Sequence, residues 1–174
     1  MPTINGRACV VNGTPVDKVF SNGKQVYGRN LLTGTGNHTV TCTGEYNPRY
    51  LSNETRDDFL TLFKGLEGQT VTVSVDYEYS GFVAGSGQNR LGWEIEMVAG
   101  TTTDFGAWYW PSNDSGSRRM SSTFVVPKNI TGIRYASGFI NLSGSGTGTL
   151  SHLKLEKGSV ATPWTPAPED IQKI

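Results

Sequence analysis

The chain has 174 residues, enough for one domain with a sizeable core, and its 22 glycines and low charged fraction of 17% are typical of an all-β, hairpin-rich domain. Its 15 basic and 15 acidic residues balance, which argues against nucleic acid as a partner because nucleic-acid-binding domains carry a basic excess. No apolar run approaches the roughly 18 residues that a membrane span needs, and the first residues lack the basic and apolar regions of a secretory signal.

The first 27 residues are expected to form a small β-meander that is separate from the main domain. Asn12 and Gly13 predict a type I′ turn, in which both central residues take positive φ, and a second turn is expected over residues 21–24. Strands this short are not stable alone, so the meander is expected to pack on a preceding domain or on a partner subunit. Its three strands are predicted near residues 8–11, 16–20 and 25–27.

The main domain is predicted to begin at Gly28 and to contain one short helix. Residues 33–53 are rich in turn-forming residues, with extended pieces between the turns. Residues 57–64 are the helical candidate, because two Asp at the start and a Lys at the end suit the helix dipole.

Six later segments alternate apolar and polar residues with the period of two that a half-buried strand shows. Strands that recur with turn residues between them, without alternating helices, predict an antiparallel jelly-roll β-sandwich. Residues 143–148, which consist of Gly, Ser and Thr, are expected to form a flexible loop before the last strand. The strands are predicted at 70–79, 91–98, 105–110, 120–126, 130–142 and 149–156.

Three aromatic residues in a row mark the segment 106–111. On a strand, Trp108 and Trp110 would share one face about 7 Å apart, and Tyr109 would point to the other face. That spacing is close to the repeat of a sugar chain, and an indole ring suits the C–H face of a sugar. Two alternatives remain open: both Trp form a ligand platform, or both are buried in the core and Tyr109 is the exposed ring.

The sequence contains no nucleophile elbow and no metal-ligand spacing of His or Cys. Glu94 and Glu96 share a strand face, so their spacing permits the pair of carboxylates that a glycoside hydrolase needs. Arg90 and Arg134 are available to pair with them, however, and cross-strand ion pairs are the commoner explanation of such patterns. The chain is therefore expected not to be an enzyme.

A ligand-binding face accounts for more of the sequence than a catalytic site does. Polar groups opposite the apolar strand faces can hydrogen-bond sugar hydroxyls, and charged groups make the stronger bonds. The loops 85–89 and 112–116 are expected to frame the face, and no cofactor is expected. The candidate ligand-binding residues are Trp108, Trp110, Tyr109, Glu94, Glu96, Asp76, Arg90, Arg134 and Asn113.

Two segments near the ends of the main domain have a distinctive sequence. Residues 154–170 read KLEKGSVATPWTPAPED, and residues 19–32 read VFSNGKQVYGRNLL. The first resembles the end, and the second the lead-in, of carbohydrate-binding modules in tail and baseplate proteins (the evolved distal tail type) of phages that infect Gram-positive bacteria. Between them the resemblance is one of strand and loop pattern, and it covers most of residues 28–168.

The resemblance implies a jelly-roll module that binds host cell-wall saccharide without catalysis and helps the virion to recognise its host and adsorb to it. It also implies a place at the tail tip or baseplate, with other tail domains as partners. Some members hold a structural Ca²⁺, but the Asp-x-Asp-x-Asp-Gly loop is absent here. The alternatives are a purely structural tail spacer and a glycoside hydrolase that uses Glu94 and Glu96. The expected divisions are a connector at 1–27, the binding module at 28–165 and a Pro-rich linker at 166–174.

Overall fold

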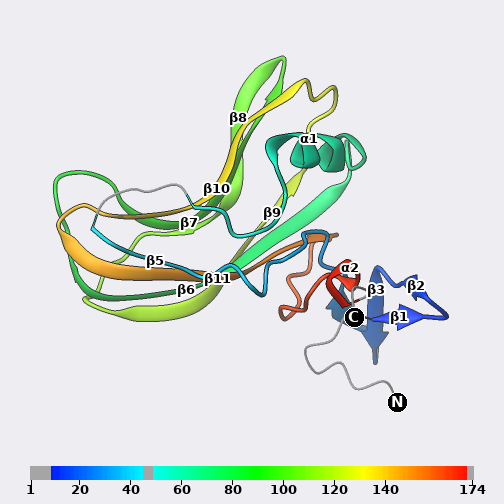
Figure 1. Cartoon of the computed structure of the whole chain (residues 1–174), viewed down its shortest axis with the longest axis horizontal. Helices are drawn as coiled ribbons and strands as arrows, with labels where there is room; N and C mark the ends of the chain where they lie inside the picture. Colours follow the sequence, from blue (N-terminus) through cyan, green and yellow to red (C-terminus); the bar gives the residue numbers. More distant parts are fainter. Residues whose placement is uncertain (1–8, 45–48, 172–174) are drawn as a thin grey trace.

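Segments in which apolar and polar residues alternate form the long strands of two antiparallel sheets, packed face to face as a β-sandwich (Figure 1). The computed structural model describes residues 9–44 and 49–171. The strands of the two sheets are β5 (Val40–Thr43), β6 (Thr70–Val83), β7 (Asn89–Ala99), β8 (Thr101–Tyr109), β9 (Gly116–Val125), β10 (Gly132–Leu142) and β11 (Ser145–Lys157). One sheet has the order β5-β11-β6-β9 and the other the order β10-β7-β8, which confirms the predicted antiparallel sandwich.

The core lies between the sheets and consists of the apolar face of each, as in other aligned sandwiches. Phe105 of β8 and Phe124 of β9 stack across the gap with their ring centroids 4.6 Å apart. Ile140 and Leu142, at the end of β10, are buried as well. The apolar side chains without exposed surface include Val71, Val73, Val75, Leu91, Ile95, Met97, Leu150, Leu153 and Leu155.

Helix α1 (Arg56–Lys64) bridges the two sheets and confirms the predicted helix. Thr55 begins it with a capping box: its hydroxyl accepts from the Asp58 N–H at 3.2 Å, and the Asp58 carboxylate accepts from the Thr55 N–H at 2.9 Å. Phe59 packs against a tryptophan of β7 with 5.9 Å between ring centroids, and Phe63 packs against a phenylalanine of β9 at 6.4 Å. Both sheets therefore hold the helix through its buried face.

The N-terminal residues form two separate hairpins instead of the predicted three-stranded meander. Their strands are β1 (Val10–Val11), β2 (Thr14–Pro15), β3 (Lys18–Ser21) and β4 (Lys24–Gly28). Both turns lie where the sequence predicts them, because Asn12, Gly13, Asn22 and Gly23 all have positive φ. The expected middle strand at 16–20 begins only at Lys18, since Val16 and Asp17 connect the two hairpins and the Val16 N–H still donates to the Cys9 carbonyl of the first, at 3.1 Å. Residue 8, at the start of the predicted first strand, lies outside the described residues.

Part of the segment expected as a flexible loop at 143–148 belongs instead to β11. Ser145 pairs with Val83 of β6, and Thr147 pairs with β5. The register with β6 shifts between the pairs Ser145–Val83 and Thr147–Ser80, at Gly146, whose φ of 130° is open mainly to glycine. Glycine at this position therefore forms a bulge within a strand. The prediction of a loop was wrong here because a Gly-rich composition is typical of loops and of strand bulges alike.

The segment after β11 packs back on the sandwich. Residues 160–167 form neither helix nor strand, as their prolines predict, but a short helix that the sequence analysis did not expect follows, α2 (Pro168–Ile171). Trp164 lies against the domain, with its indole N–H donating to the Thr35 hydroxyl at 3.1 Å and its ring 4.6 Å from that of His152. In the described part of the chain, no helix is long and apolar enough to cross a membrane.

A buried polar cluster joins this tail to β11 and to the end of β4. It consists of Lys154, Glu156, Thr162 and the backbone of Gly28, and we name it the C-terminal clasp. Lys154 and Glu156 have no exposed surface. The Lys154 ammonium donates to the Thr162 hydroxyl and to the Pro163 carbonyl, both at 2.8 Å, and Glu156 accepts from the Thr162 N–H at 2.9 Å. The Gly28 N–H donates to the same hydroxyl at 3.0 Å, so Thr162 connects all parts of the clasp.

Asn30 makes a second connection between the same parts of the chain, and its side chain is fully buried. Its amide donates to the carbonyls of Leu153 and Thr165, both at 3.3 Å, and its carbonyl accepts from the Leu155 N–H at 3.2 Å. The two segments whose sequences are distinctive, 19–32 and 154–170, therefore meet in the folded chain and are joined through buried hydrogen bonds.

The clasp predicts how stability depends on pH. Burial lowers the pKa of Lys154 from 10.5 to about 8, although Glu156 beside it acts in the opposite direction. The folded chain thus loses this proton at a lower pH than the unfolded chain, so stability rises as the pH increases from about 8 towards 10.5, by at most about 1.4 kcal/mol per pH unit. We expect the melting temperature to rise between about pH 7.5 and about pH 9.5, and Lys154→Met to lose that rise.

The upper limit of this window is set by buried tyrosines, Tyr27 among them, because burial raises the pKa of their hydroxyls and the effect has the opposite sign. The unfolded chain releases the Tyr27 proton near pH 10, so stability falls above that value. Thermal melts in matched buffers measure both effects. Equal pH profiles for the wild-type chain and Lys154→Met would show that Lys154 does not carry the rise.

Candidate functional site

The orientation of β8 decides which of its aromatic rings lie on the surface. Leu91, which is buried, pairs with Tyr109, and Gly92 pairs with Trp108. Tyr109 therefore faces the core, where its ring stacks 4.7 Å from that of Tyr77. Trp108 lies on the outer face of the three-stranded sheet, and Trp110 follows just beyond the end of β8. Of the two arrangements that the sequence left open, the structure has the one with the two Trp outside and the tyrosine inside.

The two indole rings meet edge to face rather than as one flat surface. Their centroids are 6.1 Å apart, close to the expected spacing, but their planes differ by 82°. Trp110 is 60% exposed, whereas Trp108 is partly covered. One exposed indole face is thus offered to solvent beside a second, partly covered ring.

A hollow of about 560 Å³ opens beside this pair, and we name it the Trp hollow. It is lined by Gly87, Gln88, Asn89, Arg90, Trp108 and Trp110. Gly87, Gln88 and Asn89 come from the end of the β6–β7 loop and the start of β7, so part of the loop expected to frame the binding face does so. The hollow combines an exposed aromatic ring with amide and guanidinium groups, which are the components of a site for a polar ligand.

Arg90 is held firmly at the edge of the Trp hollow. Its guanidinium lies 4.3 Å from the ring centroid of Phe139 and 5.5 Å from that of Trp108. It forms an ion pair with Glu94 at 3.0 Å, and its Nε donates to the Gln88 side-chain carbonyl at 3.2 Å. The guanidinium is therefore positioned before any ligand arrives, which lowers the entropy cost of binding.

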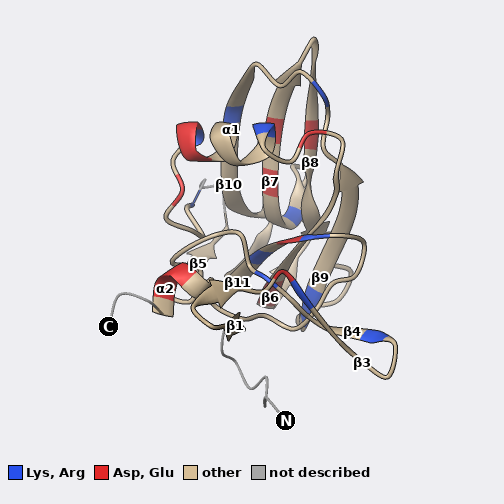
Figure 2. Ribbon diagram, turned by 90° about the vertical axis from the view of Figure 1, so that its right-hand side faces the viewer, with Lys and Arg blue, Asp and Glu red and all other residues tan. Residues whose placement is uncertain are grey.

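On the same outer face, farther from the Trp hollow, β7 and β8 carry acidic residues (Figure 2). We name them the acidic row. Glu94 is 4% exposed, and burial raises its pKa although Arg90 acts in the opposite direction. Glu96 is paired with Arg134 at 2.8 Å. Asp104 accepts from the Tyr135 hydroxyl at 2.8 Å, and burial together with this hydrogen bond raises the pKa of that hydroxyl. Each carboxylate of the row thus already has a partner.

The remaining candidate residues lie apart from this face. Asp76 is on the outer face of the four-stranded sheet, where it pairs with Arg119 at 2.7 Å and with His152 at 2.9 Å. Asn113 is exposed in the loop between β8 and β9. The structure therefore brings six of the nine candidates together. They are Trp108, Trp110, Arg90, Glu94, Glu96 and Arg134.

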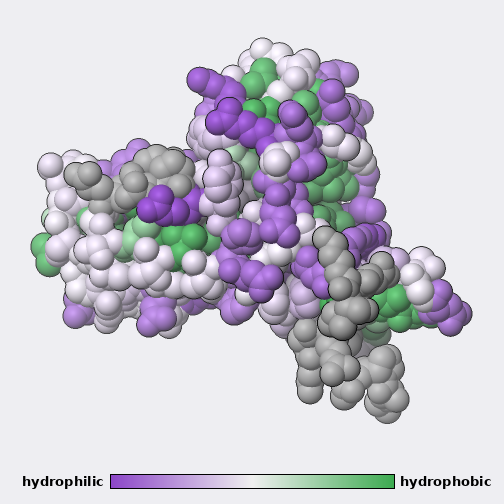
Figure 3. All heavy atoms as spheres, in the orientation of Figure 1, coloured by the Kyte–Doolittle hydropathy of each residue, from purple (hydrophilic) through white to green (hydrophobic). Residues whose placement is uncertain are grey.

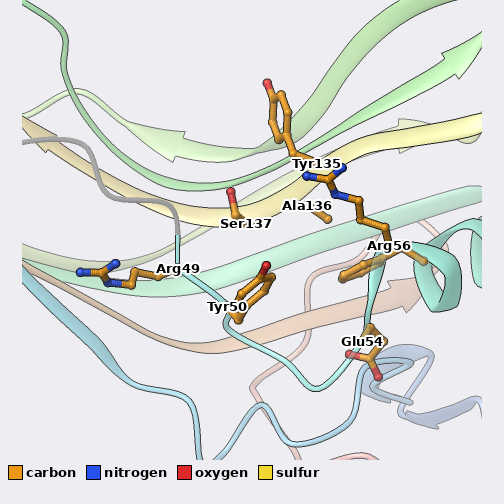
Figure 4. Close-up of a pocket in the computed structure, with 8 residues that line it drawn as sticks. Arg49, Tyr50, Glu54, Arg56, Tyr135, Ala136 and Ser137 are labelled. Carbon is orange, nitrogen blue, oxygen red and sulfur yellow. The ribbon is translucent and has the colours of Figure 1, made fainter.

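A second pocket was not anticipated from the sequence. It has a volume of about 340 Å³, and we name it the edge pocket because it lies along β10, at the edge of the three-stranded sheet (Figure 4). Its lining consists of Arg49, Tyr50, Glu54, Arg56, Phe59, Tyr135, Ala136 and Ser137. A backbone bridge between Arg49 and Gly138 joins the two stretches, which are more than seventy residues apart in the sequence. No local pattern connects stretches so distant, so no sequence signal indicated this pocket.

Comparison with known proteins adds information on the fold. No protein-family model matches the chain, and no curated protein matches it. Within the described residues, no group of three or more His, Cys, Asp or Glu is arranged to hold a metal ion.

Among solved structures, a chain from the tripod (BppUct-A-L) of the baseplate of bacteriophage Tuc2009 is similar, with a TM-score of 0.58 and 19% sequence identity. The match covers 83% of this chain and 61% of that chain, so the present chain spans less than two thirds of its length. At this identity the likeness shows a shared fold. The CBM22-2 xylan-binding domain from Paenibacillus barcinonensis matches at a TM-score of 0.35 and 12% identity, over 53% of this chain and 64% of that domain.

Proposed function

We propose that this chain is a non-catalytic saccharide-binding module of a phage tail or baseplate, and that the Trp hollow is its binding site. The observation that carries the proposal is the exposed Trp110 ring beside the fixed guanidinium of Arg90. The fold shared with a baseplate chain and the two distinctive end segments support the tail context. In this proposal residues 28–165 are the module, residues 1–27 connect it to the tail, and residues 166–174 are a Pro-rich linker.

The chemistry of the Trp hollow suits a sugar ring. One face of a pyranose is made of C–H groups, which pack on an aromatic ring and leave water, while the hydroxyls around its rim need hydrogen-bond partners. Trp110 supplies the ring, and Arg90 and Gln88 supply donors and an acceptor at its edge. The ligand is proposed to be a saccharide of the Gram-positive cell wall, so that binding aids host recognition and adsorption at the tail tip.

Contacts with other tail proteins are proposed for the N-terminal hairpins. Hydrophobic side chains are exposed there, as the green patch over β1 and β2 in Figure 3 shows. Val11 is 57% exposed and Phe20 60% exposed. Exposed apolar side chains of this kind favour contact with a neighbouring subunit. A purely structural spacer, which needs only such contacts, is therefore the second candidate function. The two candidates differ in one measurable property, because a spacer binds no saccharide.

Hydrolysis through Glu94 and Glu96 is the less favoured alternative. A glycoside hydrolase needs one carboxyl group to protonate the leaving oxygen and the other to act as base or nucleophile, and both must reach the substrate. Glu94 is nearly inaccessible and bound to Arg90, and Glu96 is bound to Arg134. Both groups are already engaged in ion pairs, Glu94 along β7 with Arg90 and Glu96 across to β10 with Arg134.

Replacing Trp110 with Ala is expected to weaken saccharide binding about five- to 150-fold, the range for loss of one stacked ring of about 1–3 kcal/mol. The full chain, labelled with a fluorophore, is applied to Gram-positive cells and to a glycan array, and the affinity for the bound glycan is then measured by calorimetry. The melting temperature is expected to change little, because the Trp110 side chain is 60% exposed.

Phe20→Ala is the matched control, because Phe20 is an aromatic residue of the same 60% exposure on β3 and lies outside the Trp hollow. It should bind as the wild-type chain does. Cell labelling that survives removal of the wall polysaccharide would contradict a sugar receptor. Trp110→Ala with unchanged affinity would remove the Trp hollow from the proposal.

A further inference from the structure

The edge pocket lies where the segment before α1 runs beside β10. Figure 4 shows Tyr50 between Arg49 and Arg56, with its hydroxyl turned toward β10, and Arg56 extending from the start of α1 to the same strand. The volume of about 340 Å³ is at the lower end of the range for ligand sites, which is about 300–1,000 Å³. The pocket therefore has room for a ligand of one or two sugar rings rather than for a large cofactor.

Its lining combines an aromatic ring with an apolar wall. Tyr50 is 72% exposed, which is more than any other large hydrophobic or aromatic side chain in the described part of the chain. Phe59 and Ala136, both buried, form apolar parts of the lining. An exposed ring beside a small apolar wall can hold the C–H face of a sugar, as Trp110 does in the Trp hollow.

Two buried polar atoms of the lining have no hydrogen-bond partner among the described residues. Ser137 is only 5% exposed, and its hydroxyl is unpaired. The Glu54 carboxylate accepts two hydrogen bonds from Thr33 through Oε1, while Oε2 is buried and unpaired. Unpaired buried polar groups are rare because each loses its bonds to water, so a ligand that supplies those bonds is the natural complement.

These atoms select the chemistry of the ligand. An apolar ligand would leave the Ser137 hydroxyl and the Glu54 oxygen unpaired, and a small anion, which Arg49 and Arg56 would attract, has no proton to donate to the Glu54 oxygen. A neutral polyhydroxylated ring donates to the carboxylate, exchanges a hydrogen bond with the serine and accepts from Arg56. A sugar therefore supplies hydrogen bonds to both the Ser137 hydroxyl and the Glu54 carboxylate, which the other ligands leave unpaired.

The edge pocket and the Trp hollow lie at opposite edges of the same three-stranded sheet. Ser137 on β10 pairs with Glu94 on β7. The next pair on the same face is Phe139 with Gly92. Gly92 in turn pairs with Trp108 on β8. Two strand spacings, about 10 Å, separate β10 from β8. A short run of sugars bridges that distance across the acidic row.

We propose that the edge pocket is a second saccharide subsite, so that the module binds a run of several sugars across the three-stranded sheet instead of a single terminal sugar. The inference rests on the proposed function, since it extends the ligand of the Trp hollow. Tyr50 is the stacking ring of this subsite, and Ser137, Glu54 and Arg56 are its hydrogen-bonding groups.

The test measures affinity as a function of ligand length. The probes are oligosaccharides from partial hydrolysis of a Gram-positive wall polysaccharide, fractionated by size from single sugars upward and titrated into the full chain by calorimetry. For the wild-type chain, affinity should rise with length until the ligand reaches both subsites. Tyr50→Ala should abolish this rise and weaken the longer ligands about five- to 150-fold, while the shortest ligands bind as before.

Two further variants keep the outcome interpretable. Tyr50→Phe keeps the ring and should retain the rise, and Ser137→Ala, which removes a hydroxyl without a partner, should reduce it without lowering the melting temperature. Trp110→Ala should weaken ligands of every length.

Each contrary result has its own meaning. A Tyr50→Ala variant that binds every length as the wild-type chain does overturns the second subsite and leaves the Trp hollow in place. Equal weakening at every length, including single sugars, also overturns it, because the pocket would then be part of one site. A wild-type chain that binds none of the fractions overturns the saccharide function and this inference together.

Discussion

Replacing Lys154 with Met at neutral pH is expected to lower the free energy of unfolding by about 1–3 kcal/mol, the cost of leaving buried polar groups without their hydrogen-bond donor. Lys154 and Glu156 have no exposed surface, and the ammonium and carboxylate are 3.9 Å apart. Methionine fills similar space but leaves the Glu156 charge buried without its cation. It also leaves the Pro163 carbonyl and the Thr162 hydroxyl without the ammonium donor.

Urea denaturation of three variants separates the charge effect from simple loss of packing. Lys157→Met is the matched control, because Lys157 is on the same strand but partly exposed, and its pair with Asp17 at 3.0 Å is worth only about 0–1 kcal/mol. Lys154→Met combined with Glu156→Gln should recover only part of the lost stability, because the buried charge is then gone but the Pro163 carbonyl still lacks its donor. If the double variant is as unstable as Lys154→Met, the unpaired charge is not the cause.

Replacing Trp93 with Ala is expected to lower the free energy of unfolding by about 3–5 kcal/mol, as for other buried tryptophans. Trp93 is 1% exposed, and its ring lies 5.9 Å from that of Phe59 in α1. The variant therefore leaves a cavity under the helix that bridges the two sheets. In a domain of this size the melting temperature should fall by roughly 6–20 °C.

Trp110→Ala supplies the control for this experiment, because it is the same substitution at the end of the neighbouring strand, on a side chain that is 60% exposed. Its melting temperature should stay close to that of the wild-type chain. Comparable losses for both variants would mean that the sheet does not present Trp110 to solvent, and the Trp hollow would then lose its stacking ring.

The strands and the helix could be predicted because their signals are local. The alternation of valines with polar residues at 70–79 places Val71, Val73 and Val75 inside without any knowledge of the partner strand. The acidic start and basic end of α1 likewise lie within one short segment. Such periodic patterns depend only on the geometry of one element, which the chain itself determines.

The face on which Trp108 and Trp110 lie could not be predicted, because β8 carries aromatic residues on both sides. Its alternation puts Tyr109 opposite the two Trp but does not say which side is the core. The neighbouring strand decides this, since buried Leu91 pairs with Tyr109. The pairing of strands is a property of the whole sheet and is absent from any single segment.

The buried charges and the edge pocket escaped prediction for a related reason. Lys154 alternates with Leu153 and Leu155, so the pattern of β11 places it on the solvent side of the sheet. The tail that covers this side, from Thr162 onward, returns only in the folded chain. The edge pocket also needs two distant stretches, and Tyr50 and Ser137 have no local relation in the sequence.

The C-terminal clasp has a mechanical consequence. Residues 28 and 165 lie against the same part of β11, joined through Thr162 and Asn30. Tension applied between these two residues loads the hydrogen bonds of the clasp first, because the shortest path for the force runs through them. The sheet β10-β7-β8 lies outside that path, so its outer face should keep its shape while these hydrogen bonds are under load. A domain built in this way separates the part that bears load from the part that presents Trp110.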